Sequence, residues 1–225
     1  MLDFHTHLLP GMDDGSRSTE ESRTLLKELE SLGFDRLALT PHFYPHMETC
    51  TDFLRRRNLL YMEFCENNPE KKLYSGCECY LHEYIFHAED ISELCFAGTR
   101  LLLTELVYDA DGGEYMLLLV RKLINTYNVI PVLSHIERYP YIMKNEKFFE
   151  EFLSMGCLAQ VNLMSFSDFF RKNRLAKYFE KDYIHFIGTD THRLPFDRKI
   201  YAKADKFLTA HFGNWREAFN NAIYL

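Results

Sequence analysis

The sequence predicts a single α/β domain in which parallel strands close into a barrel inside a ring of helices. Short apolar runs alternate with longer helical patterns along the 225 residues, and parallel strands need helical crossovers of this kind. Residue types that bind metals also recur where the apolar runs end. Because the carboxyl ends of all strands in a β/α barrel meet on one face, we expect residues 1–225 to form one domain with its functional site on that face.

The expected strands are short apolar runs bounded by polar or turn-forming residues. In chain order they cover residues 2–4, 36–40, 72–74, 101–103, 129–133, 158–161 and 184–188. The expected helices lie between and after them, near residues 18–32, 52–67, 114–127, 147–155, 167–181, 198–212 and 214–224. In the first helix, Ser18 and Glu21 form a capping box and Gly33 follows the last turn. The pattern amounts to about seven β-α units without an internal repeat.

Composition and charge exclude several classes of function. The formal net charge is -7 and no block of Lys or Arg stands out, which argues against nucleic acid as a partner because the phosphate backbone requires a concentrated basic face. The chain starts without a basic and then apolar segment, and no run of about 18 apolar residues occurs, so we expect neither a signal peptide nor a membrane span. The 6 cysteines are scattered and predict reduced thiols in the cytoplasm.

A His-x-His pattern stands at the end of the first expected strand. His5 and His7 alternate along that strand, so both side chains point to the same side, and imidazole suits Zn, Mn or Fe. Such a pair alone is as often two structural histidines. Asp13 and Asp14 follow in a loop where an Asp-Asp-Gly turn is common, but beside two histidines they become candidate hard ligands. His42 ends the second strand in a similar way.

Two glutamates follow later apolar runs. Glu78 and Glu105 stand where a buried carboxylate without a partner is costly, and a metal ion would remove that cost. For either glutamate alone, a salt bridge to Lys71 or Arg100 is the simpler explanation. The metal interpretation therefore depends on the whole set of candidates.

The remaining candidates lie after the strands at 129–133 and 184–188. His135 follows the first of these strands, and Asp190 and His192 place two ligand types on one side of the end of the other. Arg138 comes soon after His135, and its planar guanidinium suits bidentate recognition of phosphate. The sequence therefore predicts one polynuclear metal site beside an arginine.

Two other motifs point to different chemistry and are weaker. His82 and His87 are five positions apart, whereas the histidines of a zinc-binding helix are four apart and share a face. Cys50 and Arg56 have the Cys-x5-Arg spacing of cysteine-dependent phosphatases, but no glycine lies between them to form an amide cradle for phosphate. We expect neither pair to be catalytic.

Taken together, the motifs resemble the polymerase and histidinol phosphatase (PHP) superfamily. More narrowly, they resemble its bacterial capsule-associated protein-tyrosine phosphatases, the CpsB/YwqE-like group, over nearly the whole chain and in the expected order. The resemblance rests on His5-x-His7, Asp13-Asp14-Gly15, Pro41-His42, Glu78, Glu105, His135-Ile136-Glu137-Arg138-Tyr139 and Asp190-x-His192. The segment 43–46 is less polar than that group implies, which would alter access to the site.

The resemblance implies a distorted (β/α)7 TIM-like barrel that holds three divalent metal ions, with manganese expected and Fe, Zn or Mg as alternatives. It assigns one ion to His5, His7, Glu78 and Asp190. It assigns a second to Glu105, His135 and a bridging Glu78, and a third to Asp14, His42 and His192. The motif favours Asp14 over Asp13. A second catalytic arginine, beside Arg138, would be Arg193 or Arg198.

The implied activity is metal-dependent hydrolysis of a phosphomonoester, in which a hydroxide held between metal ions attacks phosphorus without a cysteine nucleophile. The expected substrate is a phosphotyrosine protein, the tail of a bacterial tyrosine autokinase that regulates capsule or exopolysaccharide synthesis. Two alternatives are a phosphatase for a small molecule such as histidinol phosphate, and a non-catalytic module for metal binding or kinase docking. All the ligand types and Arg138 are present, which argues against the non-catalytic module because a docking surface does not require them. The sequence leaves the oligomeric state open.

Overall fold

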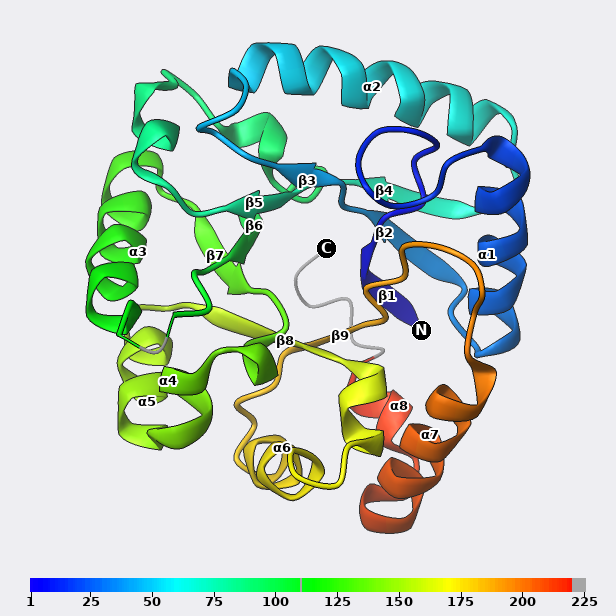
Figure 1. The fold of residues 1–225 in the computed structure, drawn as a ribbon, viewed down its shortest axis with the longest axis vertical. Coiled ribbons are helices and arrows are strands. Elements are labelled where there is room, and N and C mark those ends of the chain that lie inside the picture. The colour runs from blue at the N-terminus through cyan, green and yellow to red at the C-terminus, as the bar shows by residue number, and fades with distance from the viewer. Residues whose placement is uncertain (110, 220–225) are drawn as a thin grey trace.

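Parallel strands form a sheet that curls around the centre of the molecule, and helices surround it (Figure 1). The computed structural model describes residues 1–109 and 111–219. A 3-stranded sheet has the order β1 (Leu2–Thr6), β2 (Arg36–Leu39) and β4 (Lys72–Ser75). A 6-stranded sheet has the order β3 (His42–Phe43), β5 (Glu78–Tyr80), β6 (Leu101–Glu105), β7 (Ile130–Leu133), β8 (Leu158–Asn162) and β9 (Phe186–Gly188).

The first and last strands lie side by side. An isolated parallel bridge joins Thr6 to Thr191 just beyond β9. The Asp190 backbone N–H donates to the His5 carbonyl at 2.8 Å, and the His7 N–H donates to the Thr191 carbonyl at 2.9 Å. The segments that carry His5 and Asp190 are therefore held together although they are almost the whole chain apart in sequence.

The helices ring the strands, as Figure 1 shows, and connect successive parallel strands. They are α1 (Thr19–Ser31), α2 (Cys50–Glu66), α3 (Gly113–Tyr127), α4 (Pro140–Lys144), α5 (Glu146–Ser154), α6 (Lys172–Glu180), α7 (Arg198–Phe212) and α8 (Trp215–Ala218). Short 3-10 helices are η1 (Glu83–His87), η2 (Ser92–Leu94), η3 (Ile136–Arg138) and η4 (Leu163–Ser167). Among the described residues, no helix combines the length and apolar character needed to cross a membrane.

The alternating pattern correctly predicted a mixed α/β fold with a parallel sheet, while several boundaries differ. The helix expected at 167–181 begins later: Ser167 is the last residue of η4, and α6 begins only at Lys172. The helix expected at 214–224 ends at Ala218, and residues 220–224 lie outside the described part of the chain. The short strands β3 and β5 and the helix α4 were not predicted, because runs of two to five residues carry almost no periodic signal.

The predicted capping box of α1 is only half formed. The Ser18 hydroxyl accepts a hydrogen bond from the Glu21 N–H at 3.2 Å, as a cap should. The Glu21 carboxylate, however, accepts from the backbone N–H groups of Arg17 and Leu194, each at 2.9 Å. This glutamate therefore ties the start of α1 to the loop that follows β9 instead of closing back on Ser18.

A small apolar cluster inside the curl positions the residues above it. This inner cluster consists of Leu2, Phe4, Ala38, Phe96, Leu101, Leu103 and Val132. Alternate residues of a strand share a face, so on β6 the inward row of Leu101 and Leu103 continues to Glu105. On β1 the ligand candidates are out of phase with Leu2 and Phe4, and the pairing of β1 with β2 shifts register between Asp3 and Thr6. The apolar residues thus fill the amino-terminal end of the sheet and leave polar side chains at its carboxyl end.

Candidate metal centre

Four predicted ligands from β1, β5 and the end of β9 meet at one point. His5 Nε2 lies 3.0 Å from both His7 Nε2 and Glu78 Oε2, and His7 Nε2 lies 3.4 Å from Glu78 Oε2. Asp190 Oδ1 lies 3.5 Å from each of the two imidazole nitrogens. Ligand atoms placed tetrahedrally at about 2.0–2.2 Å from an ion are roughly 3.3–3.6 Å apart. This group therefore has the dimensions of a site for one metal ion.

The outer hydrogen bonds of the two histidines also fit a cation between them. His7 Nδ1–H donates to Asp13 Oδ2 at 2.7 Å, and His5 Nδ1–H donates to Gln160 Oε1 at 3.2 Å. When the rings are neutral, both Nε2 atoms then carry lone pairs, which face each other at 3.0 Å in a fully buried position. Two facing lone pairs repel each other, and a cation bound between them would remove the repulsion because both nitrogens would coordinate it. The donor set therefore fits a metal.

Glu78 connects this group to a second one. Its Oε1 lies 2.8 Å from His135 Nε2, and its Oε2 lies 3.1 Å from His42 Nδ1. His135 Nε2 is also 3.8 Å from Glu105 Oε1. Since Glu78 is completely buried and contacts histidines on both sides, its position is compatible with the bridging role that the resemblance implies.

A third group lies nearer to the solvent. Asp14 Oδ1 is 3.5 Å from His42 Nε2 and 3.5 Å from His192 Nε2, and the His7 imidazole stacks on that of His192 with ring centroids 3.9 Å apart. The Asp14 side chain is 62% exposed, in contrast to the buried Glu78. The side chains close enough to share an ion form three adjoining groups, of which this one is the most open: His7, Asp14, His42 and His192; His5, His7, Glu78 and Asp190; and His42, Glu78 and Glu105. Of the predicted ligands, His135 belongs to none of these groups, although its Nε2 lies 2.8 Å from Glu78 Oε1.

Asp13, which the sequence left as the less favoured member of the Asp-Asp pair, has a different position. Its Oδ2 accepts from His7 Nδ1 at 2.7 Å and from the His42 backbone N–H at 2.9 Å, and its Oδ1 accepts from Gly15 N–H at 2.9 Å. Burial opposes ionisation, but the hydrogen bonds and the charge of His7 hold the pKa of Asp13 below its usual range. Such a carboxylate fixes the orientation of a metal-binding imidazole.

Two buried amides that sequence reasoning missed link the ligands from behind. Gln160 Oε1 accepts from the His135 backbone N–H at 2.7 Å, and Gln160 Nε2 donates to Asn162 Oδ1 at 2.9 Å. Asn162 Nδ2 in turn donates to Asp190 Oδ2 at 2.9 Å. Their signal in the sequence was two alternating polar residues within the otherwise apolar strand β8.

Charges in the centre perturb one another strongly. Burial favours the neutral form of Glu78, but the positive charges and hydrogen bonds of His5 and His135 hold its pKa well below the usual value. Burial and the nearby negative charge of Glu78 raise the pKa of Glu105, whose carboxylate accepts a hydrogen bond from the Tyr108 hydroxyl. Burial and the charge of His7 lower the pKa of His42 to about 4, which keeps this imidazole neutral and able to bind a metal at physiological pH.

Two of the three candidate arginines lie beside the metal groups. Arg138, from η3, pairs with Asp190 Oδ2, and the Arg193 guanidinium donates to the Asp14 backbone carbonyl. Both line a cavity of about 520 Å³ together with His192. Arg198 instead pairs with Glu28 of α1 and does not line this cavity. The structure therefore brings Arg138 and Arg193 to the site and leaves Arg198 outside it.

The cysteine alternative has no support in the geometry. Cys50 is the first residue of α2, and burial raises the pKa of its thiol to about 11. Arg56 pairs with Glu48 at 2.7 Å and so is not free to bind phosphate beside the thiol. His82 and His87 lie at the start and end of the 3-10 helix η1, outside the three metal groups.

Comparisons with known proteins show what this chain is similar to. A family model described as "Capsular polysaccharide synthesis, CpsB/CapC" matches residues 1–216. The tyrosine-protein phosphatase CpsB of Streptococcus agalactiae is 27% identical over 228 residues, which cover 96% of this chain and 93% of that protein. The tyrosine-protein phosphatase YwqE of Bacillus subtilis is 25% identical over 86% of this chain and 78% of its own.

A solved structure shows the same fold. The crystal structures of YwqE from Bacillus subtilis and CpsB from Streptococcus pneumoniae are described as those of unique metal-dependent tyrosine phosphatases. The matched chain superimposes with a TM-score of 0.72 at 21% sequence identity, covering 95% of this chain and 88% of the other. The likeness thus extends over the whole architecture that carries the three ligand groups.

Proposed function

The chain belongs to the CpsB/CapC family of capsular polysaccharide synthesis, and we propose that it is a metal-dependent phosphatase that hydrolyses phosphotyrosine in a protein substrate. The observation that carries the proposal is the placement of Arg138 and Arg193 at the rim of three adjoining groups of metal-binding side chains. Relatives that match most of this chain are named tyrosine-protein phosphatases. A site with several cations and two guanidinium groups is suited to a dianionic phosphate monoester.

We propose that three divalent ions bind, with manganese as the principal ion and Fe, Zn or Mg as alternatives. The first would be held by His5, His7, Glu78 and Asp190, the second by Glu78, Glu105 and His135, and the third by Asp14, His42 and His192. Mixed imidazole and carboxylate ligands suit Mn, Fe and Zn. Bound ions would lower the pKa of water and polarise the phosphoryl group.

The arginines would bind and orient the phosphate. Arg138 is fixed by its ion pair with Asp190 and is 43% exposed toward the cavity, so one edge of its guanidinium is available to a ligand. Arg193 stands across the same cavity, held by the Asp14 carbonyl. Two such groups can donate paired hydrogen bonds to non-bridging phosphoryl oxygens and neutralise their charge as the P–O bond to tyrosine breaks.

Hydrolysis would consume one water and release inorganic phosphate and the tyrosine hydroxyl. The phenol leaving group has a pKa of about 10, so it departs more easily than an alkyl alcohol and demands less of a proton donor. No covalent intermediate on a cysteine is needed. Cys50 is the half-buried thiol that the sequence singled out, and its raised pKa disfavours the nucleophilic thiolate.

We also propose that the curled sheet is a distorted (β/α)7 barrel and that residues 1–225 act as one catalytic unit. Strands β2 and β3 belong to one segment of chain, and so do β4 and β5. Counted by segment, the parallel neighbours run from β1 to β9, and the Thr6–Thr191 bridge that joins these two supports closure. The family match over residues 1–216 supports a single unit.

The proposed substrate is the tyrosine-rich tail of a bacterial autophosphorylating kinase that regulates capsule or exopolysaccharide synthesis, and the proposed location is the cytoplasm. The description of the family supports a role in capsule synthesis. All 6 cysteines have free thiols, which supports a reducing compartment.

The test is hydrolysis of a phosphotyrosine peptide by metal-stripped protein, with Mn²⁺ added back. Activity should require the metal, fall below a thousandth in His135→Ala, since ions contribute several kcal/mol to the transition state, and persist in Cys50→Ser. Activity that survives chelation but is lost in Cys50→Ser would overturn the proposal. If the protein hydrolysed small phosphomonoesters but not the phosphotyrosine peptide, the metal mechanism would stand and the substrate would be a small molecule instead of a protein.

A further inference from the structure

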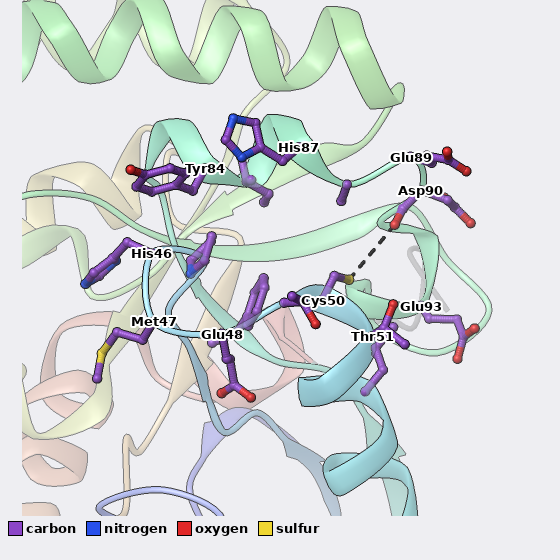
Figure 2. Close-up of a pocket in the computed structure, with 16 residues that line it drawn as sticks. His46, Met47, Glu48, Cys50, Thr51, Tyr84, His87, Glu89, Asp90 and Glu93 are labelled. Atoms are coloured by element: carbon purple, nitrogen blue, oxygen red, sulfur yellow. Dashed lines mark hydrogen bonds between the residues drawn. The ribbon is translucent and has the colours of Figure 1, made fainter.

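A second cavity, of about 700 Å³, begins at Phe43, the residue after the metal ligand candidate His42. Its walls come from the loop between β3 and α2, the first turn of α2, η1 and the residues that follow η1. Figure 2 shows His46 and Met47 on one side of it, with Tyr84 and His87 facing them. Nothing in the metal mechanism uses this cavity.

A row of rings connects the cavity to the metal centre. Tyr44 stacks on the metal ligand candidate His42 with ring centroids 5.3 Å apart, and Tyr44 contacts His46 at 5.9 Å. His46 lines the cavity and contacts His82 at 4.9 Å, which stacks on Tyr84 at 5.1 Å. An extended polypeptide covers about 3.3–3.6 Å per residue. A chain whose phosphotyrosine is at the metal centre can therefore reach the cavity with a residue about three positions away.

The floor of the cavity is apolar. Phe43 and Ile85 are each only 1% exposed, and Leu54 and Ala88 complete the surface between them. Met47 stands at the rim with 74% of its surface exposed, and a flexible thioether can adapt to different apolar side chains. Concave apolar surfaces of this size typically hold a ligand.

One end of the cavity is acidic. Figure 2 shows Glu89, Asp90 and Glu93 gathered there, and within residues 1–109 and 111–219 none of them forms an ion pair with a lysine or arginine. Hydrogen bonds from Ser92 lower the pKa of Asp90, so its carboxylate stays ionised. An apolar floor that ends in carboxylates without a lysine or arginine partner among the described residues complements an apolar side chain followed by a cation.

We propose that this cavity binds the polypeptide of the phosphotyrosine substrate, accepting an apolar side chain and an adjacent Lys or Arg about three residues from the phosphotyrosine. The inference rests on the proposed function and specifies its substrate class. The metal centre would bind the phosphate of any aryl phosphate, and the cavity would select among polypeptides. A small phosphomonoester would be too short to occupy both.

The experiment compares para-nitrophenyl phosphate with phosphotyrosine peptides of equal length. The peptides carry Leu-Lys or Ser-Glu three residues before or after the phosphotyrosine. The enzymes are the Mn²⁺-loaded wild type, the double variant Glu89→Lys/Glu93→Lys, and the double variant Glu63→Lys/Glu66→Lys, which makes the same change of charge at the exposed far end of α2. Thr51→Trp, at the exposed cavity rim, fills the cavity without changing charge.

The wild type should prefer a Leu-Lys peptide by about tenfold in kcat/KM, mainly through KM, because two or three exposed charge contacts together are worth roughly one factor of ten. The double variant should lose that preference, and Thr51→Trp should weaken both peptides. The rate on para-nitrophenyl phosphate should stay within about twofold, and Glu63→Lys/Glu66→Lys should behave as wild type.

Equal use of the two peptides by the wild type, or an unchanged preference in the double variant, would overturn the assignment. The assignment would also be overturned if the double variant lost as much activity on para-nitrophenyl phosphate as on the peptides, since the substitutions would then act through the metal centre. Failure to hydrolyse any of these compounds with any divalent metal has a different meaning. It would remove the proposed function, and the cavity assignment with it.

Discussion

The metal centre and the cavity beside it meet at residues 42–43 but are built in different ways. The centre takes its side chains from the ends of strands far apart in sequence, and Glu78, His5 and His7 are completely buried. The cavity comes from two local stretches, 43–54 and 84–93, and much of its rim is exposed. A sheet holds the first region rigidly, whereas loops shape the second, so we expect the first to determine the chemistry and the second the choice of substrate.

The largest effect should follow from Glu78→Gln. Its carboxylate contacts histidines of more than one metal group, namely His5 and His42, and glutamine keeps the volume while removing the charge that bridges them. We expect kcat/KM on para-nitrophenyl phosphate to fall roughly a thousandfold, since metal ions contribute several kcal/mol to the transition state. Metal analysis of the purified variant should show fewer bound ions than in the wild type.

The matched change in the cavity is Glu93→Gln. It removes the same charge from an exposed site, so the rate on para-nitrophenyl phosphate should stay within about twofold. If Glu93→Gln were as damaging as Glu78→Gln, the division between a chemical and a selective region would be wrong.

The arginines allow a second comparison. Arg138→Ala should lower kcat/KM about a hundredfold, the usual cost of removing one donor to a developing negative charge. Arg198→Ala should change it by less than about twofold, because Arg198 pairs with Glu28 on the outside of α1. The measurement is steady-state kinetics on para-nitrophenyl phosphate, with circular dichroism to verify folding. A large loss of kcat/KM in Arg198→Ala would mean that Arg198 acts in the site.

Asp13 and Asp14 test the difference between a residue that orients a metal ligand and a residue that itself binds the metal. Asp13→Asn keeps the shape but weakens the hydrogen bond that orients His7, so metal affinity should fall about 10- to 100-fold. With saturating Mn²⁺, the kcat of Asp13→Asn should recover. Asp14→Asn should leave the affinity of the buried His5–Glu78 group almost unchanged and weaken only the open third group. Isothermal titration with Mn²⁺ separates the two patterns.

The ligand candidates could be found from the sequence because each stands where a short apolar run stops. Leu101 and Leu103 read as an inward row, and the next inward residue, Glu105, is polar. The same reasoning could not find the role of Gln160, since its hydrogen bond to the His135 N–H depends on how β7 and β8 lie beside each other. Periodicity describes one strand at a time and carries no information about that neighbour.

The choice between arginines also required the structure. Arg193 and Arg198 lie five residues apart in sequence, and only their contacts distinguish them: Arg193 donates to the Asp14 carbonyl, whereas Arg198 pairs with Glu28. The cavity was equally hidden, because its walls come from loops and from the short helix η1, which lack a periodic pattern. Regular elements were thus predictable from local sequence, and the features that depend on long-range contacts were not.

The smallest effect should come from Cys50, which lines the cavity. Burial raises the pKa of its thiol to about 11, so only roughly one molecule in a thousand carries the thiolate at pH 8. In a Cys65→Ser background, alkylation of Cys50 by iodoacetamide should be slow at pH 8 and should still accelerate above pH 9, because the pKa is raised and the reactive form accumulates only as pH approaches it. Mass spectrometry of the modified peptide gives the rate. Alkylation that reaches its plateau near pH 7, together with loss of para-nitrophenyl phosphate hydrolysis, would mean that Cys50 is an activated nucleophile and that the metal centre is not where the chemistry occurs.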